Sequence, residues 1–356
     1  MKRFGQNGKS SSNTEKEVIV VETGITNESL WTSLKEEVET RFGFEVEKYT
    51  PIKRGWLNQK WKIETNQGVY LIKQYNRERI KLYDLQTIQS ALQTQNRLFS
   101  KGLACPELLS YKGDLLQKSA EGELFTVMRF MEGRLIAPGH VSNEQIQSLG
   151  EEVGKLHNLL NDGTLSAKSE TLFKLPSIEE RVEYWQTELN KCDEQGLDQI
   201  RSLMDFQKTA TLTFNIEQFE NLTPGWCHRD LWVDNLLFSE NHITAILDFD
   251  RMNYDYLEMD IGRLIISTCL QNNTLNRKAV QAFLTGYNNT NELSVERLVM
   301  SLRLVWYMES TWWIDVIPHE GEPPKRFQQE MVWLAGHLEQ LENMMNWKKE
   351  EVTFMF

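Results

Sequence analysis

The feature of this sequence that most restricts its fold is the octapeptide HRDLWVDN, which begins at His228 and ends at Asn235. A stretch that fits a short hairpin follows it and leads into ILDFD, which ends at Asp250. The two segments place Asp230, Asn235 and Asp248 in or next to loops between short extended runs. Charged and amide side chains in such loops are typical of functional sites rather than of a core. The rest of the chain is therefore expected to fold around a site at these residues.

The residue types in these segments indicate phosphoryl transfer. They match the catalytic-loop pattern H-R-D-L-x-x-x-N of protein kinases, with Asp248 where the metal-binding D-F-G lies. A carboxylate must accept the proton of the acceptor hydroxyl, which is the role predicted for Asp230. Mg²⁺ is a hard ion that binds oxygen ligands, so Asn235 and Asp248 are the predicted metal ligands. Five fixed positions in eight residues would seldom match by chance in a chain of this length.

The length and charge of the chain limit the remaining classes of protein. At 356 residues it is about twice the usual size of a domain, which favours two packed lobes. The formal net charge is -12 and the lysines and arginines do not cluster, so nucleic acid is not an expected partner. An acidic surface would suit a cationic acceptor, but solubility explains it equally well.

The cysteines and the N-terminus favour a cytoplasmic protein. Cys105, Cys192, Cys227 and Cys269 are scattered without a C-x-x-C pair, which predicts reduced, buried thiols. No apolar core follows the first basic residues, and no later run approaches about 18 apolar residues. We therefore expect neither a signal peptide nor a membrane span.

Residues 18–131 are predicted to form a small lobe, after a disordered polar tail at residues 1–17. The lobe is expected to open with a helix near Asn27 that ends before Gly43. Three antiparallel strands are predicted in EVEKYTPI, QKWKIET and VYLIKQY. A helix from Asp84 to Ser100 and extended runs in ELLSYKG and LFTVMRFM are expected to complete it.

Residues 132–356 are predicted to form a mainly helical lobe. Ser142 and Gln145 can make a capping box for its first helix. Two further helices are expected, one at 178–191 and one at 298–314. A final helical pattern contains Met331, Leu334, Leu338, Leu341 and Met345. The loop before it contains the helix breakers Pro318, Gly321, Pro323 and Pro324.

The small lobe contains candidates for nucleotide binding. Lys73 lies on the third predicted strand, in the position of the kinase lysine that holds the α- and β-phosphates. The turn RGWLNQK, with Gly55 and Asn58, is either a phosphate-covering loop or a simple hairpin turn. The strand that ends in VMRFMEG is either a hinge that binds adenine or an ordinary strand end. The adenine contacts expected of a hinge belong to Met128, Arg129 and Met131.

Three further strings extend the likeness beyond the catalytic loop: KGLACPELL, EEVGKLHNLL and YDYLEMDIGRLI. With them, the chain from about residue 54 to residue 263 resembles the aminoglycoside phosphotransferase and choline kinase-like family. The resemblance implies an α+β, two-lobed protein-kinase-like fold with a small antiparallel-sheet N-lobe and a mainly helical C-lobe. It also implies transfer of phosphate from ATP, with Mg²⁺, to a hydroxyl of a small molecule, as in aminoglycoside, choline or homoserine kinases.

The segment after Asp250 argues against a protein substrate. A helix is expected there within about ten residues, which leaves no room for the activation segment of a protein kinase. Within the family, two features are most similar to spore-coat kinase-like proteins of endospore-forming bacteria. They are the run RGWLNQKWKIETNQGVYLIK, which leads into a helix containing QTQNRL, and the Trp-rich C-terminus. That narrower likeness implies spore-coat proteins as partners and the spore coat as a second location.

One departure from the family pattern concerns the partner of Lys73. An active kinase usually pairs this lysine with a glutamate of the following helix, but the stretch 84–100 contains none. It contains Gln86, Gln89, Gln93 and Gln95 instead. A glutamine can bond the ammonium group but cannot neutralise it, so either the variant tolerates glutamine or nucleotide binding is impaired. We favour tolerance because the base and both metal ligands are retained; the alternative is a spore-coat or assembly protein with little or no turnover.

The sequence leaves the acceptor unnamed and the oligomeric state open. Trp306, Glu309 and Trp313 share one face of an expected helix, and aromatic walls with a carboxylate recognise amines. A core helix is the favoured interpretation, because apolar stripes usually face a core.

Four other polar residues near the catalytic groups have less specific signals. Asp234 and Asp250 either contact an amine acceptor or are solvated. His228 and Asp260 are expected to be structural, with Asp260 accepting hydrogen bonds from N–H groups of the catalytic loop.

Overall fold

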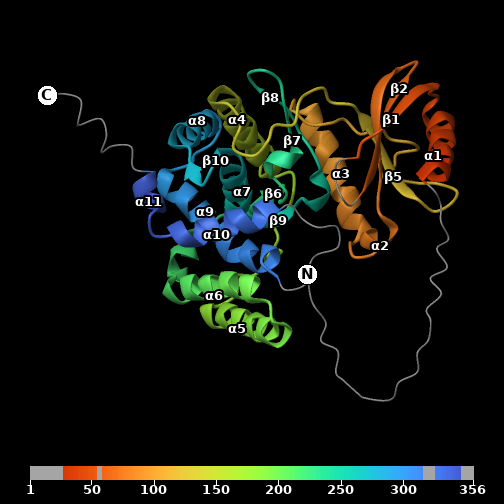
Figure 1. Ribbon diagram of the computed structural model, residues 1–356. Coiled ribbons are helices and arrows are strands. Elements are labelled where there is room, and N and C mark those ends of the chain that lie inside the picture. Colours follow the sequence, from red (N-terminus) through yellow and green to blue (C-terminus); the bar gives the residue numbers. More distant parts are fainter. Residues whose placement is uncertain (1–26, 54–57, 316–324, 346–356) are drawn as a thin grey trace, which may run out of the picture.

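The computed structural model describes residues 27–53, 58–315 and 325–345 (Figure 1). A sheet and helix α1 (Asn27–Phe42) form a small lobe at one end, and most of the other helices form a larger lobe. Helix α3 (Leu85–Ser100) lies between the sheet and the larger lobe. The predicted α+β class, with a small antiparallel sheet followed by a helical region, is confirmed. The predicted tail at 1–17, Gly55 and the proline-containing loop at 318–324 lie outside the described residues.

The small lobe is built on an antiparallel sheet in the order β1-β2-β3-β5-β4. Its strands are β1 (Val46–Pro51), β2 (Gln59–Thr65), β3 (Gly68–Gln74), β4 (Gln117–Lys118) and β5 (Leu124–Arg129). On β3, Tyr70 and Ile72 pack with α1 in an apolar core. Because side chains alternate along a strand, Lys73 lies on the opposite face. The predicted meander of three strands is confirmed, and it directs Lys73 away from the α1 core.

The extended run predicted in ELLSYKG is confirmed only at its start, where the Leu109 N–H donates to the Val127 oxygen and the Glu107 oxygen accepts the Arg129 N–H, both at 2.8 Å. Of this segment only Leu108 forms a bridge to β5, opposite Met128. Lys112 and Gly113 have φ angles of 54° and 90°, so the chain turns there instead of extending. The edge position of the sheet is taken by the later strand β4.

The helices of the small lobe begin and end at the expected signals. Helix α1 ends next to Gly43, whose φ of 69° is the left-handed conformation that glycine adopts readily. Helix α3 begins after Asp84, whose side chain accepts hydrogen bonds from the backbone N–H of Gln86 and Thr87. A short helix α2 (Arg77–Ile80) precedes α3 and was not predicted.

The larger lobe consists of helices and short strand pairs. Its helices are α4 (Asn143–Leu160), α5 (Ile178–Gln195), α6 (Asp198–Thr213), α7 (Leu257–Cys269), α8 (Arg277–Tyr287), α9 (Val295–Trp313), α10 (Lys325–His337) and α11 (Leu341–Met344). Its paired strands are β6 (Pro224–Cys227) with β9 (Asn253–Tyr256), β7 (Leu236–Phe238) with β8 (Ile243–Ile246), and β10 (Leu270–Gln271) with β11 (Thr274–Leu275). Helix α7 is buried along its whole length and follows β9 directly, so the predicted early helix after Asp250 is confirmed.

Helix boundaries in this lobe show where local signals suffice. The capping box of Ser142 and Gln145 at the start of α4 is confirmed. Helix α6 was not predicted, and it has no side-chain cap to mark its start. The final pattern is two helices rather than one, because the Arg303 guanidinium donates two hydrogen bonds, of 3.1 and 2.8 Å, to the backbone oxygen of Leu338. That oxygen is then not available to a continuing helix.

Two expectations about the environment of the chain can be compared with the fold. All four cysteines are buried free thiols, as predicted. Among the described residues, no helix combines the length and the apolar character needed to cross a bilayer.

Candidate active site between the sheet and the helical lobe

The catalytic loop is held in place by a buried carboxylate at the start of α7. Both side-chain oxygens of Asp260 accept hydrogen bonds of 2.7 Å, one from the backbone N–H of His228 and one from that of Arg229. Burial opposes the charge, but hydrogen bonding from His157 and the nearby cations lower the pKa of Asp260. The structural role predicted for Asp260 is confirmed.

His228 connects the catalytic loop to the segment that contains Asp248. Its Nδ1 accepts the backbone N–H of Asp230 at 3.2 Å, and its Nε2 donates to the backbone oxygen of Leu247 at 3.0 Å. Burial lowers the pKa of His228, which favours the neutral ring that this donor and acceptor pattern requires. His228 therefore joins the backbones on either side of the site, as expected for a structural residue.

Asp248 faces Lys73 across the gap between the lobes. The φ of Asp248 is 67°, an uncommon value for a residue other than glycine, and it reflects a sharp turn after β8. Its Oδ1 lies 2.5 Å from the Lys73 Nζ. Burial alone would raise the pKa of Asp248, but the charges of Lys73 and Lys60 lower it well below its usual range. The carboxylate is therefore ionised at neutral pH.

The charge partner missing from α3 is supplied by Asp250. Its Oδ2 lies 2.5 Å from the Lys73 Nζ, and its Oδ1 accepts a hydrogen bond of 3.0 Å from the Tyr75 hydroxyl. Lys73 is 4% exposed, so an unpaired ammonium group here would be strongly disfavoured. The second aspartate of D-F-D thus replaces the helix glutamate as a carboxylate partner of this lysine.

The glutamines of α3 do not take this role. Gln95 donates to the backbone oxygen of Pro106 at 2.7 Å. Gln86, Gln89 and Gln93 are exposed. Among the described residues, none of the α3 glutamines therefore forms the expected hydrogen bond to Lys73.

Lys73→Met is expected to lower the free energy of unfolding by about 3 kcal/mol. This is the low end of the range for breaking a buried ion pair, because water can still reach the Asp248 carboxylate that loses its partner. Adding Asp250→Asn to this variant is expected to recover part of the loss, because one of the two unpaired carboxylates is removed. Urea unfolding without ligands measures both changes. Lys48→Met is the control, because the exposed Lys48–Glu64 pair contributes about 1 kcal/mol or less. Equal effects at Lys48 and Lys73 would contradict the assigned pairing.

The predicted metal ligands have the donor atoms that Mg²⁺ requires. The Asn235 Nδ2 donates to the backbone oxygen of Asp230 at 2.8 Å, which leaves its side-chain oxygen for a metal. Asp248 uses Oδ1 for Lys73, which leaves Oδ2. One carboxylate and one amide oxygen fit Mg²⁺, which takes its other ligands from phosphates and water. The described residues contain no cluster of three or more His, Cys, Asp or Glu that would form a metal site made of protein ligands alone.

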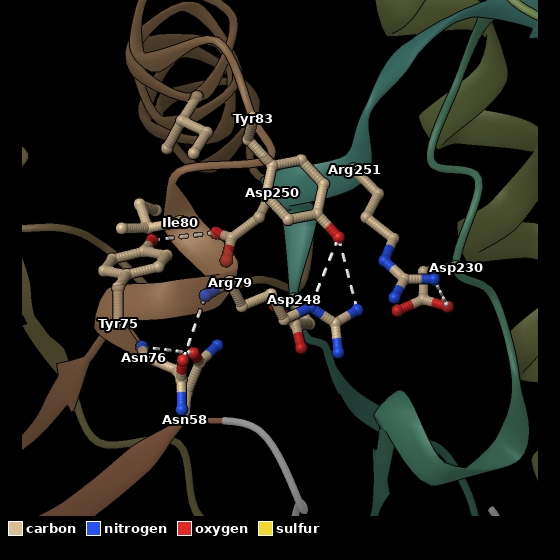
Figure 2. A pocket seen from close by; sticks show the side chains of 11 residues that line it. Asn58, Tyr75, Asn76, Arg79, Ile80, Tyr83, Asp230, Asp248, Asp250 and Arg251 are labelled. Carbon is tan, nitrogen blue, oxygen red and sulfur yellow. Dashed lines mark hydrogen bonds and ion pairs between the residues drawn. The ribbon is translucent and has the colours of Figure 1, made fainter. Parts of the chain in front are cut away.

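A cavity of about 80 Å³ opens at this point, and Figure 2 shows the side chains around it. It is lined by Asn58, Tyr75, Asn76, Arg79, Ile80, Tyr83, Ile88, Asp230, Asp248, Asp250 and Arg251. The predicted base, Asp230, lies here with its Oδ1 at 3.6 Å from the Arg251 guanidinium. The structure therefore brings the predicted base and a predicted metal ligand to one space, next to Lys73.

Of the other described residues predicted to bind nucleotide, one lines the cavity and three do not. Asn58 lines it, and its side chain accepts the backbone N–H of Asn76 at 3.1 Å. Met128 and Arg129 end β5, and Met131 follows them. None of these three residues lines the cavity, so their adenine contacts remain predictions.

Several polar residues of the site were not predicted. Lys60 lies directly opposite Lys73 across the β2–β3 pair, and burial lowers its pKa. The alternation in QKWKIET could have indicated that Lys60 shares a face with Lys73 after strand pairing. Arg79, Tyr83 and Arg251 gave no such signal, because only the folded chain brings them to the cavity that Asp230 lines.

The aromatic helix face is mainly core, as favoured. Trp306 is 1% exposed and donates its ring N–H to the Gln207 side chain at 2.7 Å. Glu309 binds the Arg263 guanidinium and accepts the ring N–H of Trp313 at 2.6 Å. The carboxylate of this face is therefore already used inside the protein.

Sequence comparisons agree with the geometry. The model described as the phosphotransferase enzyme family matches residues 48–296. Homoserine kinase of Sinorhizobium medicae (strain WSM419) is 24% identical over 277 residues, or 76% of this chain and 80% of that protein. Homoserine kinase of Bartonella tribocorum is 26% identical over 226 residues, or 63% of this chain and 65% of that protein.

Solved structures show the same fold. An aminoglycoside phosphotransferase from Alicyclobacillus acidocaldarius has a TM-score of 0.59 at 12% identity, covering 84% of this chain and 90% of that chain. A spectinomycin phosphotransferase in complex with ADP and spectinomycin has a TM-score of 0.56 at 14% identity, covering 87% of this chain and 98% of that chain. At these identities the likeness concerns the fold alone, and it confirms the predicted kinase-like architecture.

Proposed function

Since the chain belongs to the phosphotransferase enzyme family, whose model matches residues 48–296, we propose that it transfers the γ-phosphate of ATP to a hydroxyl group of a small molecule. The observation that carries this proposal is that Asp230 and Asp248 line one cavity and that Asp248 binds Lys73, although the three residues come from three separate segments. Base, metal ligand and phosphate-binding cation are the groups that such a transfer needs.

In the proposed reaction Asp230 accepts the proton of the acceptor hydroxyl. The hydroxyl oxygen forms a bond to the γ-phosphorus while the bond between that phosphorus and the bridging oxygen breaks, which leaves ADP. Lys73 donates to the α- and β-phosphates and keeps Asp250 as its carboxylate partner. Mg²⁺, held by Asn235 and Asp248, would neutralise charge on the phosphates.

The homoserine kinase relatives support a small acceptor. The bond from Asn235 to the backbone of Asp230 couples the metal site to the base, so both would be in position together. An assembly role without turnover has no support from these relatives, which are named as kinases.

Wild-type protein is expected to gain thermal stability with Mg-ATP, and Asp248→Ala is expected to abolish that gain, because the metal loses its carboxylate ligand. Differential scanning fluorimetry of each protein with and without nucleotide measures the shift. Asp205→Ala is the control, since Asp205 is an exposed residue of α6. No shift of the wild type at millimolar Mg-ATP would refute the proposal. Transfer of labelled γ-phosphate to homoserine, amino alcohols, sugars and aminoglycosides then identifies the acceptor class.

A further inference from the structure

Arg79, on the short helix α2, has a guanidinium group in the cavity with only a neutral partner. Its Nε and one terminal nitrogen donate to the Tyr83 hydroxyl at 3.3 and 3.2 Å. Among the described residues it forms no ion pair with a carboxylate, although it is partly buried. A guanidinium has five N–H donors, so most of its donors are left for a ligand.

Arg251 brings a second guanidinium to the same cavity from the D-F-D segment. Its only ion pair within the described part of the chain is the long contact of 3.6 Å to Asp230. Figure 2 shows Tyr83 with its hydroxyl directed toward the space that both arginines line. The two guanidinium groups therefore reach one cavity from opposite lobes.

The charges of the cavity select between kinds of acceptor. In the proposed nucleotide complex Asp248 serves the metal, and Asp250 stays with Lys73 and Tyr75. Among the described residues that line the cavity, the charged groups left to face an acceptor are then Asp230, Arg79 and Arg251. An acceptor with only an amine would meet two cations, whereas a carboxylate would match the planar donor pairs of the arginines.

We propose that Arg79 and Arg251 form an anion subsite and that the acceptor is a small hydroxy acid whose carboxylate they bind. The inference rests on the proposed function and adds the class of substrate to it. In this arrangement the carboxylate anchors the molecule while its hydroxyl lies against Asp230.

Three acceptors that differ in their charged groups test the subsite: L-homoserine, 4-hydroxybutanoate and 3-aminopropan-1-ol, the last without a carboxylate. L-homoserine and 4-hydroxybutanoate are expected to be phosphorylated on their hydroxyl groups. Their kcat/KM is expected to be at least about tenfold above that of 3-aminopropan-1-ol, which is the difference that one charge-assisted hydrogen bond can give. Arg79→Gln is expected to raise the KM of the two acids by about tenfold or more, with the KM of ATP within about twofold.

Two further variants separate a binding role from a structural one. Arg77→Gln is the matched control, because the half-exposed Arg77 side chain pairs with Glu123 instead of lining the cavity. Arg79→Lys keeps the charge but not the planar fork, so it is expected to give a smaller rise in KM than Arg79→Gln. Equal effects at Arg77 and Arg79 would overturn the assignment.

Four other outcomes would contradict either the anion subsite or the proposed function. A rise in the KM of ATP, rather than of the acids, would mean that Arg79 binds the nucleotide and would overturn the subsite. Equal use of 3-aminopropan-1-ol and L-homoserine would overturn it as well. If Mg-ATP stabilises the protein but neither acid is phosphorylated, the subsite fails while the nucleotide function stands. If Mg-ATP has no effect, the proposed function itself fails.

Discussion

Asp230→Asn is expected to lower kcat by about 10²- to 10⁴-fold, because an amide cannot accept the proton of the acceptor hydroxyl. The KM of ATP is expected to change little, since the ion-pair partner of Asp230 in the structure is Arg251 rather than Lys73. Asparagine has nearly the same shape as aspartate, so the loop and its bond from Asn235 to the Asp230 backbone are expected to persist. Steady-state kinetics with a coupled assay for ADP, with and without acceptor, measures the change.

The control for this variant is Asp205→Asn, which makes the same chemical change on an exposed face of α6. It is expected to keep wild-type kinetics. A kcat for Asp230→Asn within threefold of the wild type would show that another group accepts the proton. A loss confined to the KM of ATP would instead place Asp230 in the nucleotide site.

Asp260→Ala is expected to lower the free energy of unfolding by about 4–5 kcal/mol, the upper part of the range for removing one partner from a buried charged network. The carboxylate is fully buried and accepts the backbone N–H groups of His228 and Arg229. Without the carboxylate, these two buried N–H groups lose their hydrogen-bond acceptor. Since the same bonds hold the catalytic loop, activity is expected to fall with stability. Urea unfolding, followed by circular dichroism, measures the loss.

The pH dependence of the Asp260 contribution has a definite sign. The folded state lowers the pKa of Asp260, so its contribution is fully present above the ordinary value of about 4. That contribution is lost only as pH falls through the lower, folded pKa. The stability gap between wild type and Asp260→Ala is therefore expected to narrow below about pH 4 and not near neutrality. Asp193→Ala, which breaks the exposed pair with Arg201, is the control and is expected to change stability by about 1 kcal/mol or less.

Much of the fold could be predicted from the sequence, because its signals are local. The three-strand meander, the capping box of Ser142 and the stop at Gly43 each depend on residues a few positions apart. The extended run predicted in ELLSYKG is shorter than expected, because the chain turns at Lys112 and Gly113, which adopt left-handed backbone conformations. The prediction of one final helical pattern did not foresee the break between α10 and α11, because that break depends on Arg303, which is distant in sequence and binds the Leu338 carbonyl.

The candidate site divides in the same way. The spacing within HRDLWVDN and ILDFD was sufficient to predict that Asp230, Asn235 and Asp248 lie close together, because a short loop and a hairpin hold them at a set separation. Their roles as base and metal ligands stay predictions. The partner of Lys73 could not be found locally. The predicted place for it was the adjacent helix, where the sequence offers only glutamines.

By itself, the amino-acid sequence determined the three-strand meander of the small lobe and pointed to the catalytic-loop motif and to phosphoryl transfer, since these follow from neighbouring residues. Only the tertiary structure decided that Asp250, 177 positions from Lys73, neutralises this lysine. The tertiary structure also decided that Arg79 and Arg251 line the same cavity as Asp230. The reason is physical: a buried charge must find its partner in space, and the packing of the two lobes, not the spacing along the chain, sets which charges become neighbours.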